Sequence, residues 1–291
     1  MVASVSRARV ARRGAQNNAL LVVAHPGHEL RLFGWMRAAR PDVLVLTDGS
    51  GSDGCSRLAS TQCVLEKAGA NAGALFGRYT DKRIYIALLA HDEDFFVDIA
   101  FAIAELLLTR RYSQVVADPL EGYNPTHDIC RVVVDAAVRF VAVRSSMRIR
   151  NYDYGLINPL RPPQPAADWI RVHLPPDLVA HKVAAALAYD ELASEVTETL
   201  CAENVRSLHE EWLRPVNPHA ADAAQPPDDP PLYEQFGEQR LSTGRYSQVI
   251  RYREHFVPIV EALARFASPP AARMSSTSAG RNPADISCSA E

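Results

Sequence analysis

Apolar segments of two kinds alternate along most of the chain, and this alternation constrains the fold more than any other feature of the sequence. Short β-branched and aliphatic segments, such as residues 19–24 and 42–47, have the composition of buried strands. Longer segments between them carry apolar residues at helical spacing. Strands that alternate with helices favour a parallel sheet covered on both faces, and the right-handed crossover rule makes such a sheet doubly wound. We therefore predict an α/β fold with a doubly wound, mostly parallel, Rossmann-like sheet, helices on both faces and C-terminal additions.

The same patterns place the individual elements along the chain. The predicted strands are residues 19–24, 42–47, 83–88, 114–117, 148–154 and 169–174, and the predicted helices are 28–39, 55–68, 92–109, 127–143, 175–200 and 246–266, the last interrupted at Pro258.

The chain ends and one internal segment lack such patterns. The polar, basic residues 1–17 and the Pro-, Ser- and Ala-rich residues 268–291 are predicted to be disordered tails. Between them, residues 18–267 are predicted to form a single domain, in which Pro- and Asp-rich composition predicts a long loop over 214–240.

Composition narrows the class of partner. Lysine and arginine number 31 against 34 acidic residues, a balance that argues against a nucleic-acid partner. No apolar run is long enough to span a bilayer, so no membrane partner is expected. The five cysteines form no CxxC pair and read as reduced thiols of a cytoplasmic protein. The expected partner is a small-molecule substrate, whereas the oligomeric state is not predicted.

Three histidines fall where predicted strands end. His25 and His28 follow the strand over 19–24, and His127 begins the helix that comes after the strand over 114–117. Ligands of open parallel sheets bind at the carboxyl ends of the strands. Three neutral imidazoles with one open position are a common set of zinc ligands in enzymes, although imidazole also suits other divalent transition metals. The pattern predicts a metal site, with Zn²⁺ preferred.

Four short motifs resemble the PIG-L/LmbE-like zinc-dependent N-deacetylases. The family motif Ala-His-Pro-Asp-Asp-Glu corresponds to Ala24-His25-Pro26-Gly27-His28-Glu29, and His-Pro-Asp-His corresponds to Asn124-Pro125-Thr126-His127. Thr47-Asp48-Gly49 is similar to the family's Thr-Asp-Gly turn, and residues 182–192 to its Lys-x-x-Ala helix. The resemblance implies hydrolysis of a small-molecule amide, N-deacetylation of an amino sugar or related metabolite, with His25, His28 and His127 as metal ligands.

Two positions depart from the family pattern. Gly27 stands where the family places the aspartate that acts as general base, and Asn124 stands where a histidine helps to stabilise the oxyanion. An amide side chain can still donate there. For the missing base three explanations stay open: another carboxylate replaces it, an all-imidazole metal site supplies an already ionised nucleophile, or hydrolysis is lost and the fold only binds metal.

The candidate replacements are carboxylates of the same loops. They are Glu29, Asp48, Glu121 and Asp128, of which Asp48 and Glu29 rank first, although Asp48 also suits its turn and Asp128 its helix start. Arg57 and Glu121 are predicted to contact the substrate, since Arg57 begins a helix that faces the same sheet edge and Glu121 lies in the loop before His127.

Overall fold

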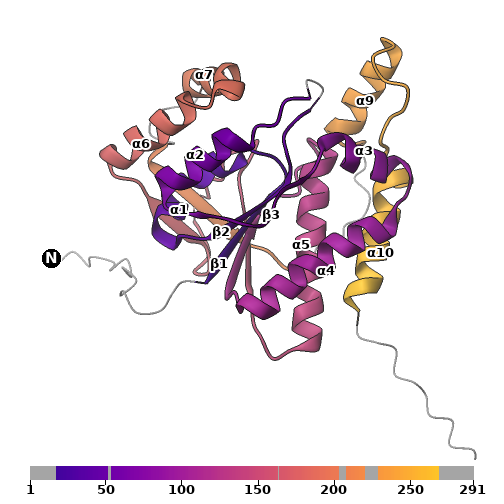
Figure 1. Cartoon of the computed structure of the whole chain (residues 1–291), viewed down its shortest axis with the longest axis horizontal. Coiled ribbons are helices and arrows are strands. Elements are labelled where there is room, and N and C mark those ends of the chain that lie inside the picture. The colour runs from indigo at the N-terminus through magenta and orange to yellow at the C-terminus, as the bar shows by residue number, and fades with distance from the viewer. Residues whose placement is uncertain (1–17, 52–53, 163, 203–207, 220–228, 269–291) are drawn as a thin grey trace, which may run out of the picture.

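The computed structural model describes residues 18–51, 54–162, 164–202, 208–219 and 229–268, so the predicted tails fall almost entirely outside the described residues. Its centre is one sheet in the order β3-β2-β1-β4-β5-β7-β6 (Figure 1). The strands are β1 (Ala19–Val23), β2 (Asp42–Thr47), β3 (Asn71–Tyr79), β4 (Gln114–Ala117), β5 (Arg150–Tyr154), β6 (Ile170–His173) and β7 (Glu210–Pro215).

Strand order reverses beside β1. The chain moves from β1 outward to β2 and β3, then returns to add β4 and β5 on the other side, and all these neighbours pair in parallel. β7 pairs antiparallel with both β5 and β6. The predicted doubly wound, mostly parallel sheet is confirmed. Its switch point lies between β1 and β4, where the connections leave in opposite directions, and open sheets of this kind bind ligands at the carboxyl ends beside such a point.

Helices cover both faces of the sheet (Figure 1). Alternate residues of β1 serve the two cores: Leu20 and Val22 join one apolar cluster, and Leu21 and Val23 join the other. The first cluster includes α4 (Glu93–Arg110), α5 (Pro125–Arg144) and α10 (Val257–Ala267); the second includes η1 (His28–Leu32), α1 (Phe33–Ala39), α2 (Leu58–Ala68) and α6 (Pro176–Leu187). Because β1 is covered on both faces, all its side chains are buried, which explains its continuous run of aliphatic residues.

The predicted strand over 83–88 is wrong. These residues belong to helix α3 (Asp81–Leu89), and the neighbouring strand is β3, which the sequence patterns do not reveal. The Thr80 hydroxyl accepts a hydrogen bond from the Arg83 N–H at 3.1 Å and so caps the helix start. Ile84, Ala87 and Leu88 are buried at helical spacing. β3 escapes prediction because it is an edge strand with mostly exposed side chains and two register shifts.

The C-terminal part also differs from the prediction. The expected loop over 214–240 overlaps the end of β7 and includes the start of α9 (Leu232–Ser242). The expected helix over 175–200 is divided into α6, a short η2 (Asp190–Leu192) and α7 (Ala193–Ala202). The last helix begins only at residue 252, as a π turn η4 (Tyr252–Phe256), and α10 then carries Pro258 in its first turn.

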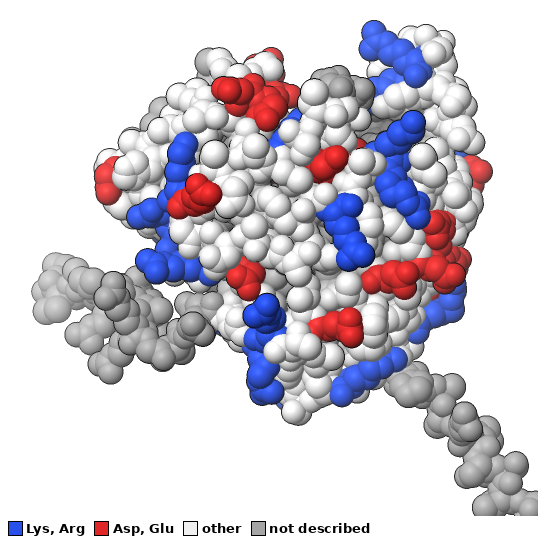
Figure 2. Space-filling view, in the orientation of Figure 1, with Lys and Arg blue, Asp and Glu red and all other residues white. Residues whose placement is uncertain are grey.

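The lengths of the apolar helices and the distribution of surface charge are two further properties of the fold. Among the described residues, no helix is both long and apolar enough to cross a bilayer. Figure 2 shows basic and acidic side chains interspersed over the face that it presents, with Lys and Arg at the upper right, over the part of the molecule where α9 lies.

A buried ion pair within α5, between Arg131 and Asp135, is joined to β5 by hydrogen bonds. Arg131 is 2% exposed, and its guanidinium donates to Asp135 at 2.6 Å, to the Asn151 side chain at 2.8 Å and to the Tyr152 carbonyl at 3.1 Å. Asn151 in turn donates to Asp135 at 2.7 Å. Burial raises the pKa of Asp135, whereas the Arg131 charge opposes that shift. Removing one partner would leave an uncompensated charge in the core.

We predict that Asp135→Ala lowers the free energy of unfolding by about 3–5 kcal/mol, because Arg131 then stays buried without its carboxylate. Urea unfolding followed by circular dichroism measures the change. Glu93→Ala, which removes the exposed partner of Arg265, is the matched control and should cost less than about 1 kcal/mol. Equal effects of the two substitutions would contradict the role assigned to the buried pair.

Candidate metal centre

His25, His28 and His127 lie together at the switch point of the sheet. His25 leaves the end of β1, His28 opens η1, and His127 lies in the first turn of α5, which follows β4. Their ring centroids are 5.3 Å apart for His25–His28, 5.1 Å for His25–His127 and 4.5 Å for His28–His127. His25 and His28 side chains are about 15% exposed, and His127 is buried. Separate segments of the sequence thus place three imidazoles around one point.

The proton on His25 is fixed by its neighbours. The Thr47 hydroxyl donates to the Ala24 carbonyl at 3.0 Å, so at its other side it accepts from His25 Nδ1 at 2.8 Å. Asp81 Oδ1 lies 2.7 Å from the same nitrogen. His25 Nδ1 is therefore the protonated nitrogen, and Nε2 keeps its lone pair. This Nε2 is buried and has no hydrogen-bond partner.

His28 is held in the same tautomer by Asp118. Its Nδ1 donates to Asp118 Oδ2 at 2.8 Å, an oxygen that also accepts from the Ala24 N–H at 2.8 Å. The other oxygen accepts from the Tyr154 hydroxyl at 2.6 Å. Burial alone would raise the pKa of Asp118, but the His28 charge and these hydrogen bonds lower it overall. Carboxylate–imidazole pairs of this kind orient metal-binding histidines in proteins.

His127 completes the cluster as a neutral ring. Burial lowers its pKa well below the usual value, and the charges of His28 and His25 act in the same direction. Its Nδ1 is buried without a hydrogen-bond partner. A buried nitrogen left without a partner costs on the order of 1–3 kcal/mol, which an ion in the cluster would offset.

The positions of the rings fit one metal ion, although their orientations do not yet do so. A zinc–nitrogen bond of about 2.0–2.1 Å and tetrahedral angles place imidazole centroids about 5 Å apart, close to the observed spacings. In the described part of the chain, however, no three His, Cys, Asp or Glu side chains already present a metal-binding arrangement. Binding therefore requires adjustment of side chains within the cluster.

The carboxylates predicted as bases lie on these loops but have other contacts. Glu29 is fully buried, its Oε2 accepts from the Gly27 N–H at 2.7 Å, and burial raises its pKa. Asp48 Oδ1 accepts from the Ser50 N–H and hydroxyl, yet its residue is only half-buried. Asp128 Oδ1 accepts from two backbone N–H groups, at Glu121 and Gly122, and burial raises its pKa to about 7.

The other predicted site residues are also placed. Asn124 caps α5, because its Oδ1 accepts from the Thr126 N–H at 2.8 Å, and it shares a hydrogen bond with Tyr85. The Glu121 carboxylate accepts from the backbone N–H of Ile157 at 2.9 Å. Arg57 is half-buried just before α2, and its carbonyl accepts from the Tyr189 hydroxyl.

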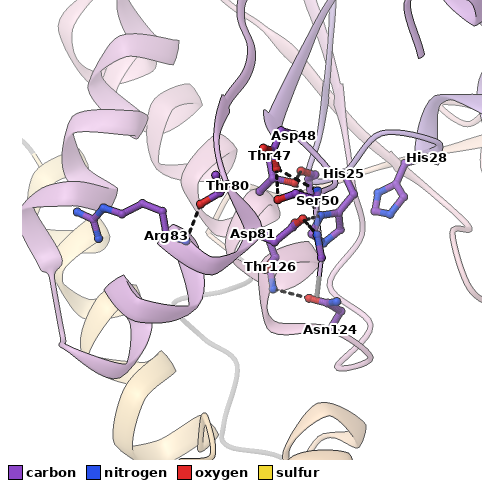
Figure 3. A network of polar contacts seen from close by, with 12 residues as sticks. His25, His28, Thr47, Asp48, Ser50, Thr80, Asp81, Arg83, Asn124 and Thr126 are labelled. Carbon is purple, nitrogen blue, oxygen red and sulfur yellow. Dashed lines mark hydrogen bonds and ion pairs between the residues drawn. The ribbon is translucent and has the colours of Figure 1, made fainter. Parts of the chain in front are cut away.

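Two residues of the site are not singled out by the sequence patterns. Asp118 directly follows β4, a position that could have identified it as a residue of the sheet edge. Asp81 starts α3 and lies beside His25, as Figure 3 shows. It escapes prediction because a strand over 83–88 would leave Asp81 away from any carboxyl end. Burial alone would raise the pKa of Asp81, but the His25 contact and the Gly51 N–H hold it well below its usual range.

Comparisons with known proteins return likenesses of structure alone. No protein-family model and no curated protein matches the chain. Similar solved structures include the conserved protein TT1542 from Thermus thermophilus, with 18% identity and a TM-score of 0.48 over 69% of this chain and 95% of that one. Another is the A40926 pseudoaglycone deacetylase Dbv21, with 16% identity and a TM-score of 0.48 over 69% of this chain and 97% of that one.

A third similar structure is the zinc inhibited form of the teicoplanin deacetylase Orf2, with 14% identity and a TM-score of 0.43 over 73% of this chain and 100% of that one. Proteins named as deacetylases thus occur among the similar structures. Identities below 20% and TM-scores below 0.5 assign no activity to this chain.

We predict that Asp81→Asn weakens Zn²⁺ binding by roughly 10–100-fold, because His25 loses the carboxylate that holds its ring. Competition with a chromophoric chelator measures the affinity. Asp92→Asn is the matched control, since Asp92 lies on the same side of the molecule, pairs with Arg83 and has no contact with a histidine of the cluster. Unchanged affinity in Asp81→Asn would show that Thr47 alone positions His25.

Proposed function

We propose that the chain is a metal-dependent hydrolase of a small-molecule amide, an N-deacetylase of an amino sugar or related metabolite, with zinc held by His25, His28 and His127. The observation that carries the proposal is the cluster of three imidazoles at the sheet's switch point, two of which are held at Nδ1 by a carboxylate. The motif resemblance supports the choice of amide hydrolysis within the reactions that such a site can perform.

Each residue of the site has a role in this proposal. A zinc ion held by the three histidines would polarise the amide carbonyl and lower the pKa of water to roughly 7. Asp81 and Thr47 contact His25 at Nδ1, and Asp118 contacts His28 at Nδ1, which leaves the Nε2 lone pair of both rings available to the ion. Asn124 lies at the start of α5 beside His127, and its amide donates to the oxygen on which negative charge develops.

Asp48 is the proposed proton acceptor. Of the other predicted carboxylates, Glu29 and Asp128 are buried; each accepts from backbone N–H groups, as Asp48 does from Ser50. Asp48 is half-buried and follows β2 directly, next to the Thr47 that contacts His25. We propose Arg57 and Glu121 as substrate contacts, because both are partly exposed on loops that border the cluster. Arg57 suits an anionic or hydroxyl-rich group and Glu121 a hydroxyl or ammonium group.

Gly27 favours a second candidate function, metal binding without hydrolysis. Its φ of +104° is a conformation that residues with a Cβ rarely adopt, and an added Cβ would lie 2.4 Å from Leu192 Cδ1. The Leu192 methyl group can turn away, but the backbone strain would remain. The family's general base is therefore absent at a position that resists its return, and a protein that only holds the ion is the natural alternative.

Zinc-loaded full-length protein is expected to release acetate from at least one compound in a panel of N-acetylated amino sugars. Chelation should abolish release and added Zn²⁺ should restore it. His127→Ala should lose both bound metal and activity, whereas His181→Ala, which removes an exposed histidine on α6, should change neither. A protein that binds one Zn²⁺ per chain through His127 and releases no acetate would support the binding-only alternative.

We predict that Gly27→Asp does not restore a base. Both Gly27→Asp and the matched Gly27→Ala should destabilise the protein by about 1–3 kcal/mol, because each forces a side chain into the same backbone conformation. Thermal unfolding compares their stabilities, and acetate release compares their rates. A rate for Gly27→Asp more than about tenfold above that of Gly27→Ala would contradict this expectation and identify position 27 as a usable base position.

A further inference from the structure

Exposed aromatic side chains continue outward from the candidate metal centre. Tyr123 lies in the loop between β4 and α5, and its ring stacks on His127 with centroids 6.3 Å apart and planes at 29°. Its other neighbour is Phe236 of α9, which meets it edge to face at 6.1 Å and 81°. Tyr123 is 40% exposed and Phe236 41% exposed. Large apolar side chains left in solvent beside a site are a common sign of ligand binding.

α9 is fixed to the site by its buried side. The Tyr233 N–H donates to the Gly122 carbonyl at 3.2 Å, which joins the helix to the loop that carries Tyr123. Tyr233 and Gly237 are the buried residues of α9, and a Cβ at Gly237 would lie 2.6 Å from Val249. The helix therefore packs closely at residues 233 and 237, so the exposed residues keep a defined position relative to the imidazoles.

The exposed side of α9 is apolar at one end and cationic at the other. Leu232, Phe236 and Arg240 are spaced at four-residue intervals and lie on one side of the helix, so neighbours are about one turn apart. Arg240 donates to the Tyr246 hydroxyl at 2.6 Å.

We propose that Tyr123, Phe236 and Arg240, here called the α9 subsite, bind an aromatic group and an adjoining carboxylate of the substrate whose amide lies at the imidazoles. This inference rests on the proposed function for its substrate class. An aromatic ring packs over the exposed faces of Tyr123 and Phe236. A planar carboxylate one helical turn further on suits the guanidinium of Arg240.

The features of this surface favour a small molecule over a second copy of the chain. Tyr123 joins it directly to His127, and Arg240 places a cation at its far end. Its exposed apolar side chains are few, whereas a stable interface buries roughly 800 Å² on each partner. A flat ligand that extends from the imidazoles along α9 uses all three residues at once.

The test compares three probes on zinc-loaded full-length protein: benzyl N-acetylglucosaminide, its 4-carboxybenzyl analogue and the methyl glycoside. Calorimetric titration should give the order carboxybenzyl, benzyl, methyl, with about three- to tenfold between successive probes. Phe236→Ala should remove the preference for benzyl over methyl, and Phe236→Leu should restore it only partly because the ring is lost. Arg240→Met should remove only the preference for the carboxylate.

The controls separate this inference from the proposed function. Leu187→Ala, which removes an exposed apolar side chain on α6, should leave all three affinities unchanged. If the probes bind in the expected order but release no acetate, the proposed hydrolysis fails and the α9 subsite stands. If the protein releases acetate but binds the three probes equally, or if Phe236→Ala only dissolves a dimer seen in sedimentation, the α9 subsite is refuted.

Discussion

The buried carboxylate of Asp118 is the contact on which the candidate site depends. It follows β4 and accepts hydrogen bonds from the Ala24 N–H after β1, the Tyr154 hydroxyl of β5 and His28 Nδ1. It therefore ties together three neighbouring strands at the switch point and sets the tautomer of a histidine between them. Because a fully buried carboxylate is costly without such partners, the strand ends and the imidazole stabilise each other. The parallel sheet brings these strand ends together, and Asp118 orients His28 beside them.

Much of the fold could be predicted from the sequence, since buried parallel strands and their covering helices follow simple patterns. Residues 42–47 and 114–117 are strands with the predicted bounds because both are buried on both faces. The patterns fail where burial is one-sided or where tertiary contacts decide. β3 is an exposed edge strand, and its mixed composition conceals it. The expected helix over 175–200 ends near Tyr189, whose buried hydroxyl contacts Thr61 and the Arg57 carbonyl on a distant segment.

Of the candidate site, the sequence predicts only the residues that lie close to the carboxyl ends of predicted strands. His25, His28 and His127 could be named because each lies near a predicted carboxyl end, and the structure places them around one point. Asp81 could not be named, because its place depends on an edge strand that the sequence does not reveal. Tyr123 and Phe236 were also beyond sequence reasoning: their contact joins a loop to a helix within a predicted loop, and no local pattern marks such a pair.

The conformation of Gly27 has a consequence for how this chain differs from the family that its motifs resemble. The Gly27 N–H donates to Glu29 Oε2, and its positive φ turns the chain from β1 into η1. Tyr189 and Leu192, beyond α6, fill the space in front of this turn. The single substitution in the motif thus changes the conformation of the main chain. This conformation also depends on a segment more than 150 residues away, which packs against the loop. A substitution at Gly27 alone would place a side chain in a loop whose conformation Glu29 already fixes. A functional aspartate at this position would therefore require simultaneous changes in the loop, in the buried Glu29 and in the segment that follows α6.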